Sequence, residues 1–521
     1  METPAATLRS TDAVYPIELA DRDGWTSSTI TTPISPLEFD LRARAFARGF
    51  SRALRDLLGV EVDVGVCRAG GYLFTLVSAR GAHPIVDVPT GLQAHDNFLG
   101  LWLAHVQPAT IQLLDRLANA SQGPLDMSAV LLEQVSSWLE ELTYLHHTML
   151  LPARVALSEF AEMVVDEGLM TSQPDALALL AGQPNATTMA AQRLWDSRHL
   201  SRREPPPVGG FLALVAETPQ EGEGYGLRHP GWLEDAAVAL AIARCYASAE
   251  PECAPDGRLR LMRAGGLARQ ADVNRCLTRH PAGVAERFAR LLRRARSAVA
   301  VTEDHAPLMH ARVGFELRQF VRKVGARLVR QGVLDDPDDV VFLHVDEIVT
   351  DGRGFADLVE ARRREADVAL VPAADSQKRL DADTLGSSRL AGYVGQVYGG
   401  QSTPVPATAG ALHGEPASSG RARGRVRRLS RHADLGDVRC GEIVVAPNNS
   451  AIWSFALPVA SAVVVPGGSR FGHLATLARD YGRPAIVAIG RGLDQLRDGD
   501  LVEVDGDGGT LVQEFADEGS D

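Results

Sequence analysis

Cysteine is scarce in this sequence, and its distribution argues against two common kinds of site. The 521 residues include five cysteines, which are scattered and form no Cys-x-x-Cys pair. An odd, dispersed set fits reduced thiols better than a disulfide framework or a cysteine-based zinc site. We therefore expect free thiols and no bound metal.

Long apolar runs are also lacking. Residues 236–249 come nearest, but they are interrupted by Arg244, and a membrane span needs roughly 18 apolar residues. The N-terminal METPAATLRS has no hydrophobic signal core. The formal net charge of -13 disfavours nucleic acid and anionic membranes as partners. These absences predict a cytoplasmic protein that binds neither.

Several catalytic signatures are missing as well. The sequence has no GxxxxGK[ST] phosphate loop, no G-x-S-x-G elbow and no HExxH. Only residues 1–34 precede the first predicted helix, which is too little chain for an ATP-binding domain. We expect no cofactor to be bound directly.

Residues 1–398 are predicted to form one mainly helical domain with a little sheet. Ser35, Pro36 and Glu38 form a helix-start signature, in which Ser35 caps and Glu38 completes a capping box. Apolar residues then recur at helical spacing along most of the segment. Residues 130–150 and 155–165 are expected to form two helices, and residues 338–344 a short strand.

The composition changes after this domain. Residues 399–419 are rich in Gly, Pro, Ala, Ser and Thr, which predicts a hinge linker. Residues 420–521 combine short β runs with a single helix. The overall fold class is therefore multidomain, with a large α-helical domain followed by a small β/α domain.

The segment from Val463 to Val487 carries the strongest chemical signal. An apolar strand ends in a Gly-rich turn that opens a helix at His473, and Gly482 and Pro484 end that helix. A histidine in the first helical turn lies where backbone N–H groups and the helix dipole favour an anion. We predict that His473 is an accessible imidazole that accepts a phosphoryl group, and that Arg470 helps to stabilise its charge.

These residues resemble the swivelling phosphohistidine domain of phosphoenolpyruvate synthase, pyruvate phosphate dikinase and rifampin phosphotransferase. GRARGRVRRL resembles the opening strand of that domain, and LRDGDLVEVDGDGGTLV its closing hairpin. The resemblance implies a β/β/α swivelling domain with His473 as the phosphoryl carrier. The turn departs from the family pattern at Val465, Ser469 and Gly472.

The helical part is similar to the substrate domain of rifampin phosphotransferase-like proteins. YLHHTMLLPARVALSEFAEMV, GLRHPGWLEDA and LRQFVRKVGARLVRQGVLDDPDDVVFLHVDEI carry this similarity. In that family an ATP-grasp domain precedes the helical and histidine domains. The resemblance therefore implies ATP and Mg²⁺ only through a separate ATP-grasp protein.

The candidate substrate-binding residues are Tyr144, His146, His147, His305 and Trp453. Adjacent helical positions point about 100° apart, so His146 and His147 cannot easily bind one ion. His305 and His310 follow Glu303 and Asp304. Any of these histidines is a candidate base for a substrate hydroxyl.

Three functions remain open from the sequence. The first is the substrate-binding and phosphohistidine part of a split phosphotransferase that acts on a hydroxyl of a bulky, apolar small molecule. The second is a phosphate-independent dehydratase or cyclase that acts on a polyketide-like natural-product intermediate. The third is a binding protein without turnover.

Overall fold

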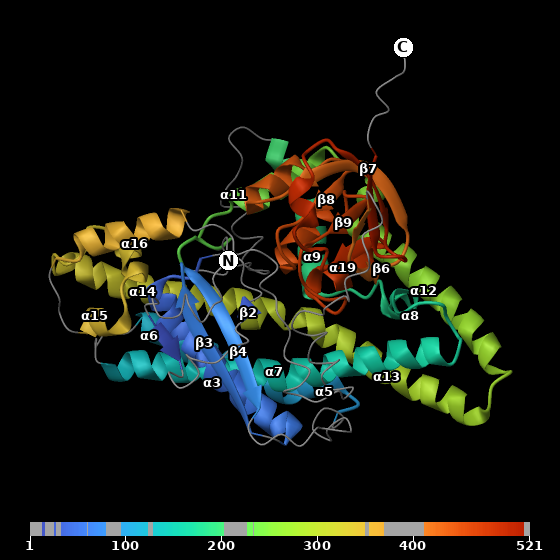
Figure 1. The fold of residues 1–521 in the computed structure, drawn as a ribbon, viewed down its shortest axis with the longest axis horizontal. Helices are drawn as coiled ribbons and strands as arrows, with labels where there is room; N and C mark the ends of the chain where they lie inside the picture. The colour runs from blue at the N-terminus through green and yellow to red at the C-terminus, as the bar shows by residue number, and fades with distance from the viewer. Residues whose placement is uncertain are drawn as a thin grey trace, which may run out of the picture.

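The computed structural model describes residues 13–15, 26–27, 33–59, 61–79, 95–122, 129–202, 227–232, 234–349, 354–368 and 411–514. Over these ranges the chain forms a large helical domain followed by a small β/α domain, which lies over the middle of the long helices (Figure 1). The predicted fold class is confirmed.

The N-terminal part combines a helix with a small antiparallel sheet. Ser35 accepts a hydrogen bond from the Glu38 backbone N–H, so the predicted helix start is confirmed. The β3–β4 hairpin turns at Gly70 and Gly71, which both have positive φ. The elements are α2 (Pro36–Glu38), the π turn η2 (Phe39–Ala43) and α3 (Arg44–Leu58), with strands in the order β1 (Ala13–Tyr15), β3 (Val62–Ala69), β4 (Tyr72–Ala79) and β2 (Thr26–Ser27).

The rest of the helical domain is organised around two long helices, α7 and α13, which run side by side (Figure 1). Each helix in the described ranges is too short or too polar to cross a membrane. The α-helices are α5 (Phe98–Leu101), α6 (Gln107–Gln122), α7 (Ala129–Asp166), α8 (Gln173–Leu177), α9 (Ala186–Asp196), α11 (Ala237–Ala247), α12 (Pro255–Leu277), α13 (Ala282–Asp304), α14 (Val313–Arg330), α15 (Val345–Val349) and α16 (Ala356–Val368). The short turns between them are η3 (Trp102–Val106), η4 (Ala178–Leu180), η5 (Arg198–Arg202), η7 (Pro251–Cys253), η8 (Pro307–Arg312) and η9 (Pro337–Phe342).

Two local predictions are wrong. The two helices expected over 130–150 and 155–165 are one continuous helix, α7, which passes through Pro152. Apolar side chains on both sides of Pro152 are buried against neighbouring helices. This packing outweighs the hydrogen bond and the steric fit that a proline loses inside a helix. The strand expected over 338–344 is largely the 3-10 turn η9, because Pro337 starts it and the Asp336 carboxylate accepts from the Asp338 N–H.

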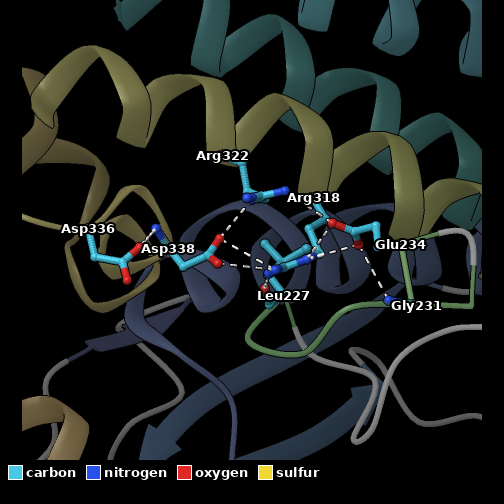
Figure 2. Close-up of polar contacts among 7 residues, drawn as sticks. All are labelled: Leu227, Gly231, Glu234, Arg318, Arg322, Asp336 and Asp338. Atoms are coloured by element: carbon cyan, nitrogen blue, oxygen red, sulfur yellow. Dashed lines mark hydrogen bonds and ion pairs between the residues drawn. The ribbon is translucent and has the colours of Figure 1, made fainter. Parts of the chain in front are cut away.

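A buried arginine joins two segments that carry the family resemblance. Arg318 on α14 donates to the Glu234 carboxylate and to the Leu227 carbonyl, and it also pairs with Asp338 (Figure 2). The Arg318 side chain is only 6% exposed, whereas that of the neighbouring Arg322 is 42% exposed. The Arg318 network therefore fixes the 227–234 segment against α14 and η9.

The C-terminal domain is built on an eight-stranded sheet with the order β5-β12-β11-β7-β8-β9-β10-β6. The two edge strands, β5 and β6, are joined by Gly414 alone, so the sheet must curl until its edges approach each other. The strands are β5 (Ala411–His413), β6 (Glu415–Ser418), β7 (Arg421–Arg428), β8 (Ile443–Val445), β9 (Ala462–Val464), β10 (Ala485–Val487), β11 (Leu501–Asp505) and β12 (Thr510–Glu514). The helical elements are α19 (His473–Tyr481) and the 3-10 turns η11 (His432–Asp437), η12 (Ala451–Ala456) and η13 (Gly490–Gln495).

These strands correct the predicted linker. Residues 399–410 lie outside the described residues, but residues 411–418, also assigned to the hinge, form β5 and β6. The low hydrophobicity of this stretch was misleading, because backbone hydrogen bonds to β12 and β10 hold it in the sheet. In the structure the C-terminal domain therefore begins at Ala411, and we retain the proposed hinge only for the part before it.

The two domains share a hydrophobic core. Side chains of α9, α11 and α12 pack in one buried cluster with η12, α19 and the sheet of the C-terminal domain. Tyr246 donates its hydroxyl to the Phe455 carbonyl at 2.7 Å, and Arg258 donates to the Tyr481 carbonyl at 2.9 Å. The C-terminal domain is thus packed against α9, α11 and α12, and we call this the docked arrangement.

Candidate functional site

The helix that carries His473 is capped from a distant loop. Its N-cap residue is Gly472, which has no side chain to offer. The Asn449 Oδ1 atom accepts from the Leu474 N–H at 3.1 Å instead. A Cβ added at Gly472 would lie 1.6 Å from the Asn449 amide nitrogen. The departure from the family pattern at Gly472 is therefore matched by the Asn449 side chain, which occupies the vacated space.

His473 lies against the helical domain and contacts a buried acid. Its Nδ1 atom is 3.2 Å from Oε2 of Glu303, near the C-terminal end of α13. The His473 side chain is 14% exposed and that of Glu303 is 1% exposed. The expectation of an accessible imidazole is wrong for the docked arrangement, because the His473 ring is covered by Glu303 and by the neighbouring His305 ring.

Burial makes the neutral forms of this pair the favoured ones. It lowers the pKa of His473 to about 3, and the nearby positive charge of Arg154 acts in the same direction. Burial also raises the pKa of Glu303 well above its usual value; Asp304 adds to this rise, while Arg154 and Arg479 oppose it. Both shifts favour the uncharged form of each group.

Three more histidines of the helical domain gather next to His473. The ring centre of His305 lies 5.5 Å from that of His473, and the ring of His310 lies 6.2 Å from it. His146 on α7 completes the group, at 4.9 Å from His305 and 5.1 Å from His310. Burial lowers the pKa of all three, so neutral imidazoles surround His473.

Local backbone geometry positions these rings. His310 belongs to the π turn η8, which begins directly after α13. His305 lies between α13 and η8, and its carbonyl accepts from the Leu308 and Met309 N–H groups at 3.2 and 2.8 Å, so one helical turn leads from His305 to His310. The His305 Nδ1 atom donates to the Val301 carbonyl at 2.8 Å, since a carbonyl oxygen can only accept. The His305 Nε2 atom therefore carries a lone pair.

Arg470 is committed elsewhere in the docked arrangement. It forms an ion pair with Glu415 and donates to the Gln173 side chain at 2.5 Å. Arg479, on the same helix as His473, donates to the Arg470 carbonyl at 2.7 Å. The role of Arg470 in stabilising a phosphoryl group stays a prediction, and it requires Arg470 to leave Glu415.

The other predicted binding residues lie in different surroundings. Tyr144 donates its hydroxyl to Asp56 at 2.7 Å, and the Arg52 guanidinium lies over its ring. His147 is buried and packs on the Phe50 ring at 4.4 Å.

The assignment of Trp453 is corrected. Trp453 is 2% exposed in the core of the C-terminal domain, and its Nε1 atom donates to Asn448 at 2.9 Å. Its ring is in edge contact with His432. It is a packing residue of this domain, since both its ring and its N–H group are used within it.

Two residues of the site were missed from the sequence. Arg154 follows His147 by seven positions on α7, so helical spacing would have placed them on one face. Asn449 precedes Leu474 by 25 positions. No local pattern links a loop amide to a helix cap at that separation.

Comparisons with known proteins agree with this architecture. Residues 438–509 match the family model of the PEP-utilising enzyme, mobile domain. A chondramide synthase of Chondromyces crocatus is 27% identical over 535 residues, covering 92% of this chain and 13% of the relative. A rifampicin phosphotransferase of Streptomyces sp is 30% identical over 369 residues, covering 64% of this chain and 40% of the relative.

A further relative extends the same pattern. An uncharacterized phosphotransferase of Bacillus subtilis is 26% identical over 236 residues, covering 44% of this chain and 27% of the relative. The chain thus spans between 13% and 40% of the length of these three relatives. The predicted resemblance to PEP-utilising enzymes is confirmed, and the match to their mobile domain lies within the C-terminal domain.

Proposed function

We propose that this chain is the substrate-binding and phosphohistidine part of a phosphotransferase, with His473 as the phosphoryl carrier. One observation carries the proposal. The only histidine of α19 is seated against a buried acid and three imidazoles of the helical domain. Relatives that are named rifampicin phosphotransferases support a substrate that is a bulky, largely apolar small molecule with a hydroxyl group.

The hydrogen bond to Glu303 selects the nitrogen that takes the phosphoryl group. Glu303 holds Nδ1, whereas Nε2 of His473 has no hydrogen bond to another described residue. Phosphorylation at Nε2 leaves the Nδ1 proton in place to interact with Glu303. The carboxylate then orients the ring and favours the developing positive charge on it, as an acid beside a nucleophilic histidine does.

The phosphoryl group passes from His473 to the substrate in a single displacement. The substrate hydroxyl oxygen forms an O–P bond as the N–P bond to His473 breaks, and the bonding pair returns to Nε2. The hydroxyl proton passes to a base of the helical domain. Glu303 is the candidate base. The positive charge of the phosphorylated His473 ring favours its ionised form, and a carboxylate whose pKa is raised by burial is a stronger proton acceptor. Positioning provides most of the acceleration in phosphoryl transfer.

The source of the phosphoryl group is proposed to be a separate ATP-grasp protein with ATP and Mg²⁺. The C-terminal domain would leave the docked arrangement, receive the group at that partner and return to the helical domain. This route needs the domain to separate from α11 and α12, although it shares a core with them.

Intact-mass spectrometry after incubation with ATP, Mg²⁺ and a candidate ATP-grasp protein tests the proposal. We expect an acid-labile gain of one phosphoryl group, which is lost in His473→Gln and kept in His105→Gln, a variant of an exposed histidine on η3. A phosphoryl group that persists in His473→Gln, or a wild-type chain that no such partner phosphorylates, contradicts the proposal.

A second function is favoured by the electrostatics of the same pair. A neutral, buried carboxylic acid and imidazole that share a proton are suited to general acid–base chemistry without phosphate. The relative named chondramide synthase supports a natural-product intermediate as substrate for such a dehydratase or cyclase. Retained turnover in a chain that cannot be phosphorylated would favour this alternative.

A further inference from the structure

Three imidazoles of the helical domain converge from two helical segments. His146 comes from α7, His305 follows α13 and His310 belongs to η8. One ring nitrogen from each lies within 4.8 Å of the other two. The three residues belong to the helical domain alone, so their arrangement does not depend on how His473 is used.

Two of these nitrogens lack an expected partner. The His305 Nε2 and His146 Nδ1 atoms are buried and have no hydrogen bond. His305 is 0% exposed, so no solvent compensates. A buried polar atom without a partner is unfavourable, because it has lost its hydrogen bonds to water without replacing them. Two such atoms in one imidazole cluster indicate a ligand that binds lone pairs rather than a purely structural arrangement.

We propose that His146, His305 and His310 bind a divalent transition-metal ion of the zinc class. Imidazole nitrogen suits Zn²⁺, Co²⁺ and Ni²⁺, and a set of three histidines without carboxylate disfavours Mg²⁺ and Ca²⁺. This proposal replaces our sequence-based expectation of no metal, which rested on the cysteine pattern. His146 lies more than 150 positions before His305 and His310, so no local sequence pattern indicates that the three form one site.

The hydrogen bond made by the other ring nitrogen of His305 fits this assignment. Its Nδ1 proton is donated to the Val301 carbonyl, which fixes the ring and leaves Nε2 as the ligand atom. This is the arrangement that metal-binding histidines commonly adopt. Nitrogens around a tetrahedral zinc are roughly 3.4 Å apart, given Zn–N distances near 2.0–2.1 Å. The three nitrogens lie within 4.8 Å of one another, so each pair must approach by at most about 1.4 Å to reach this spacing. Side-chain rotation can provide this movement.

The surrounding charges act in both directions. Arg154 and Arg42 place positive charge near the cluster and weaken the binding of a cation. Glu303, whose side chain contacts His473, is the acid next to the cluster and offsets part of this repulsion when ionised. Three protein ligands leave at least one coordination position for water or a substrate oxygen. If the proposed phosphotransfer operates, that position lies on the side of the helical domain that His473 contacts.

Zinc titration of the full chain by isothermal calorimetry, with metal content measured after dialysis, tests the site. We expect one Zn²⁺ per chain, and we expect His146→Ala and His310→Ala each to weaken binding at least 100-fold. His105→Gln should bind as the wild type does. Circular dichroism and thermal unfolding of each variant without metal identify any that fail to fold, and His310→Asn then replaces such a variant.

The His473→Gln variant separates this proposal from the phosphohistidine function. We expect it to bind zinc within a few-fold of wild type, because His473 is outside the ligand set. Wild-type protein that binds no stoichiometric zinc overturns the metal site and leaves the phosphorylation of His473 untouched. Binding that persists in folded variants of both His146 and His310 overturns it equally.

Discussion

Glu303 and His473 are 170 positions apart in the sequence, yet Oε2 of one lies 3.2 Å from Nδ1 of the other. This contact crosses the boundary between the helical and C-terminal domains, so it exists only when the two are docked. A mobile domain that swings away would expose both groups to water and return their pKa values toward ordinary ones. The reactivity of His473 is therefore coupled to the position of its domain.

A cysteine pair can trap this docked arrangement. Cys253 in the helical domain and Cys440 in the C-terminal domain have their sulfur atoms 3.5 Å apart. We predict that diamide forms a disulfide between them, with the two thiol hydrogens and two electrons passing to diamide. Burial raises the pKa of Cys253 to about 11, with Cys440 adding to the rise, so mildly alkaline buffer is needed to supply thiolate.

Peptide mapping of the oxidised chain identifies the bond. Cys440→Ser should abolish it, while Cys276→Ser should leave it intact because Cys276 is an exposed residue of α12. The cross-linked chain should also lose phosphorylation by a separate partner and regain it on reduction. A cross-link that forms as readily to Cys276 would contradict the docked arrangement.

The cap of the His473 helix predicts that Gly472 cannot be replaced by a larger residue without loss of stability. Gly472→Ala places a methyl group against the Asn449 amide, which must then move and release the Leu474 N–H. We expect the free energy of unfolding to fall by about 1–3 kcal/mol, as overpacking typically does. Gly283→Ala in α13 meets no atom within 4 Å and should be neutral or stabilising. Chemical denaturation of both variants makes the comparison.

Asp480 predicts a specific dependence of stability on pH. It accepts hydrogen bonds across the domain boundary from the Gly182 N–H and the Asn185 amide. Burial raises the pKa of Asp480 from 3.8 to about 7; the charge of Glu303 adds to this rise, and Arg479 opposes it. Because the pKa is higher in the folded chain, protonated Asp480 contributes to the free energy of unfolding. This contribution is fully present below pH 3.8 and declines as pH rises to about 7.

The measurement is the difference in unfolding free energy between wild type and Asp480→Asn at several pH values. Asparagine does not titrate, so other groups largely cancel in this difference. We expect the wild type to lose stability relative to the variant between pH 4 and 7 and the difference to level off above that range. A difference that grows in favour of the wild type as pH rises would show that Asp480 is ionised in the folded chain.

The Arg318 network in Figure 2 predicts unequal effects for two neighbouring arginines. Arg318→Met removes the closer of the two arginines that pair with the Glu234 carboxylate, which is 12% exposed, and leaves the Leu227 carbonyl without its donor. We expect a loss of about 3–5 kcal/mol in unfolding free energy, typical of a broken buried ion pair. Arg322→Met removes an exposed pair with Asp338 and a longer, 3.5 Å pair with Glu234, which keeps Arg318 as its partner, and should change stability by about 1 kcal/mol or less. Equal losses in thermal unfolding experiments would contradict the assigned burial.

Local sequence patterns determined much of the framework. The start of α2 at Ser35 and the end of α19 at Gly482 followed from capping chemistry that acts over a few residues. The position of His473 at the first turn of a helix followed in the same way. These features depend on neighbours within one helical turn, so the residues beside them in the sequence are sufficient to indicate them.

The surroundings of His473 were decided by the tertiary structure. Glu303 and the imidazole cluster come from the helical domain, and only the docking of the two domains brings them to His473, while Asn449 caps the helix from a loop of the C-terminal domain itself. Contacts within the C-terminal domain bury Trp453, and backbone hydrogen bonds to β12 and β10 hold residues 411–418 in a sheet. Hydrogen bonds and burial between distant segments leave no periodic trace in the sequence. The position of His473 at the start of a helix could therefore be predicted, whereas its contacts with Glu303 and His305 could not.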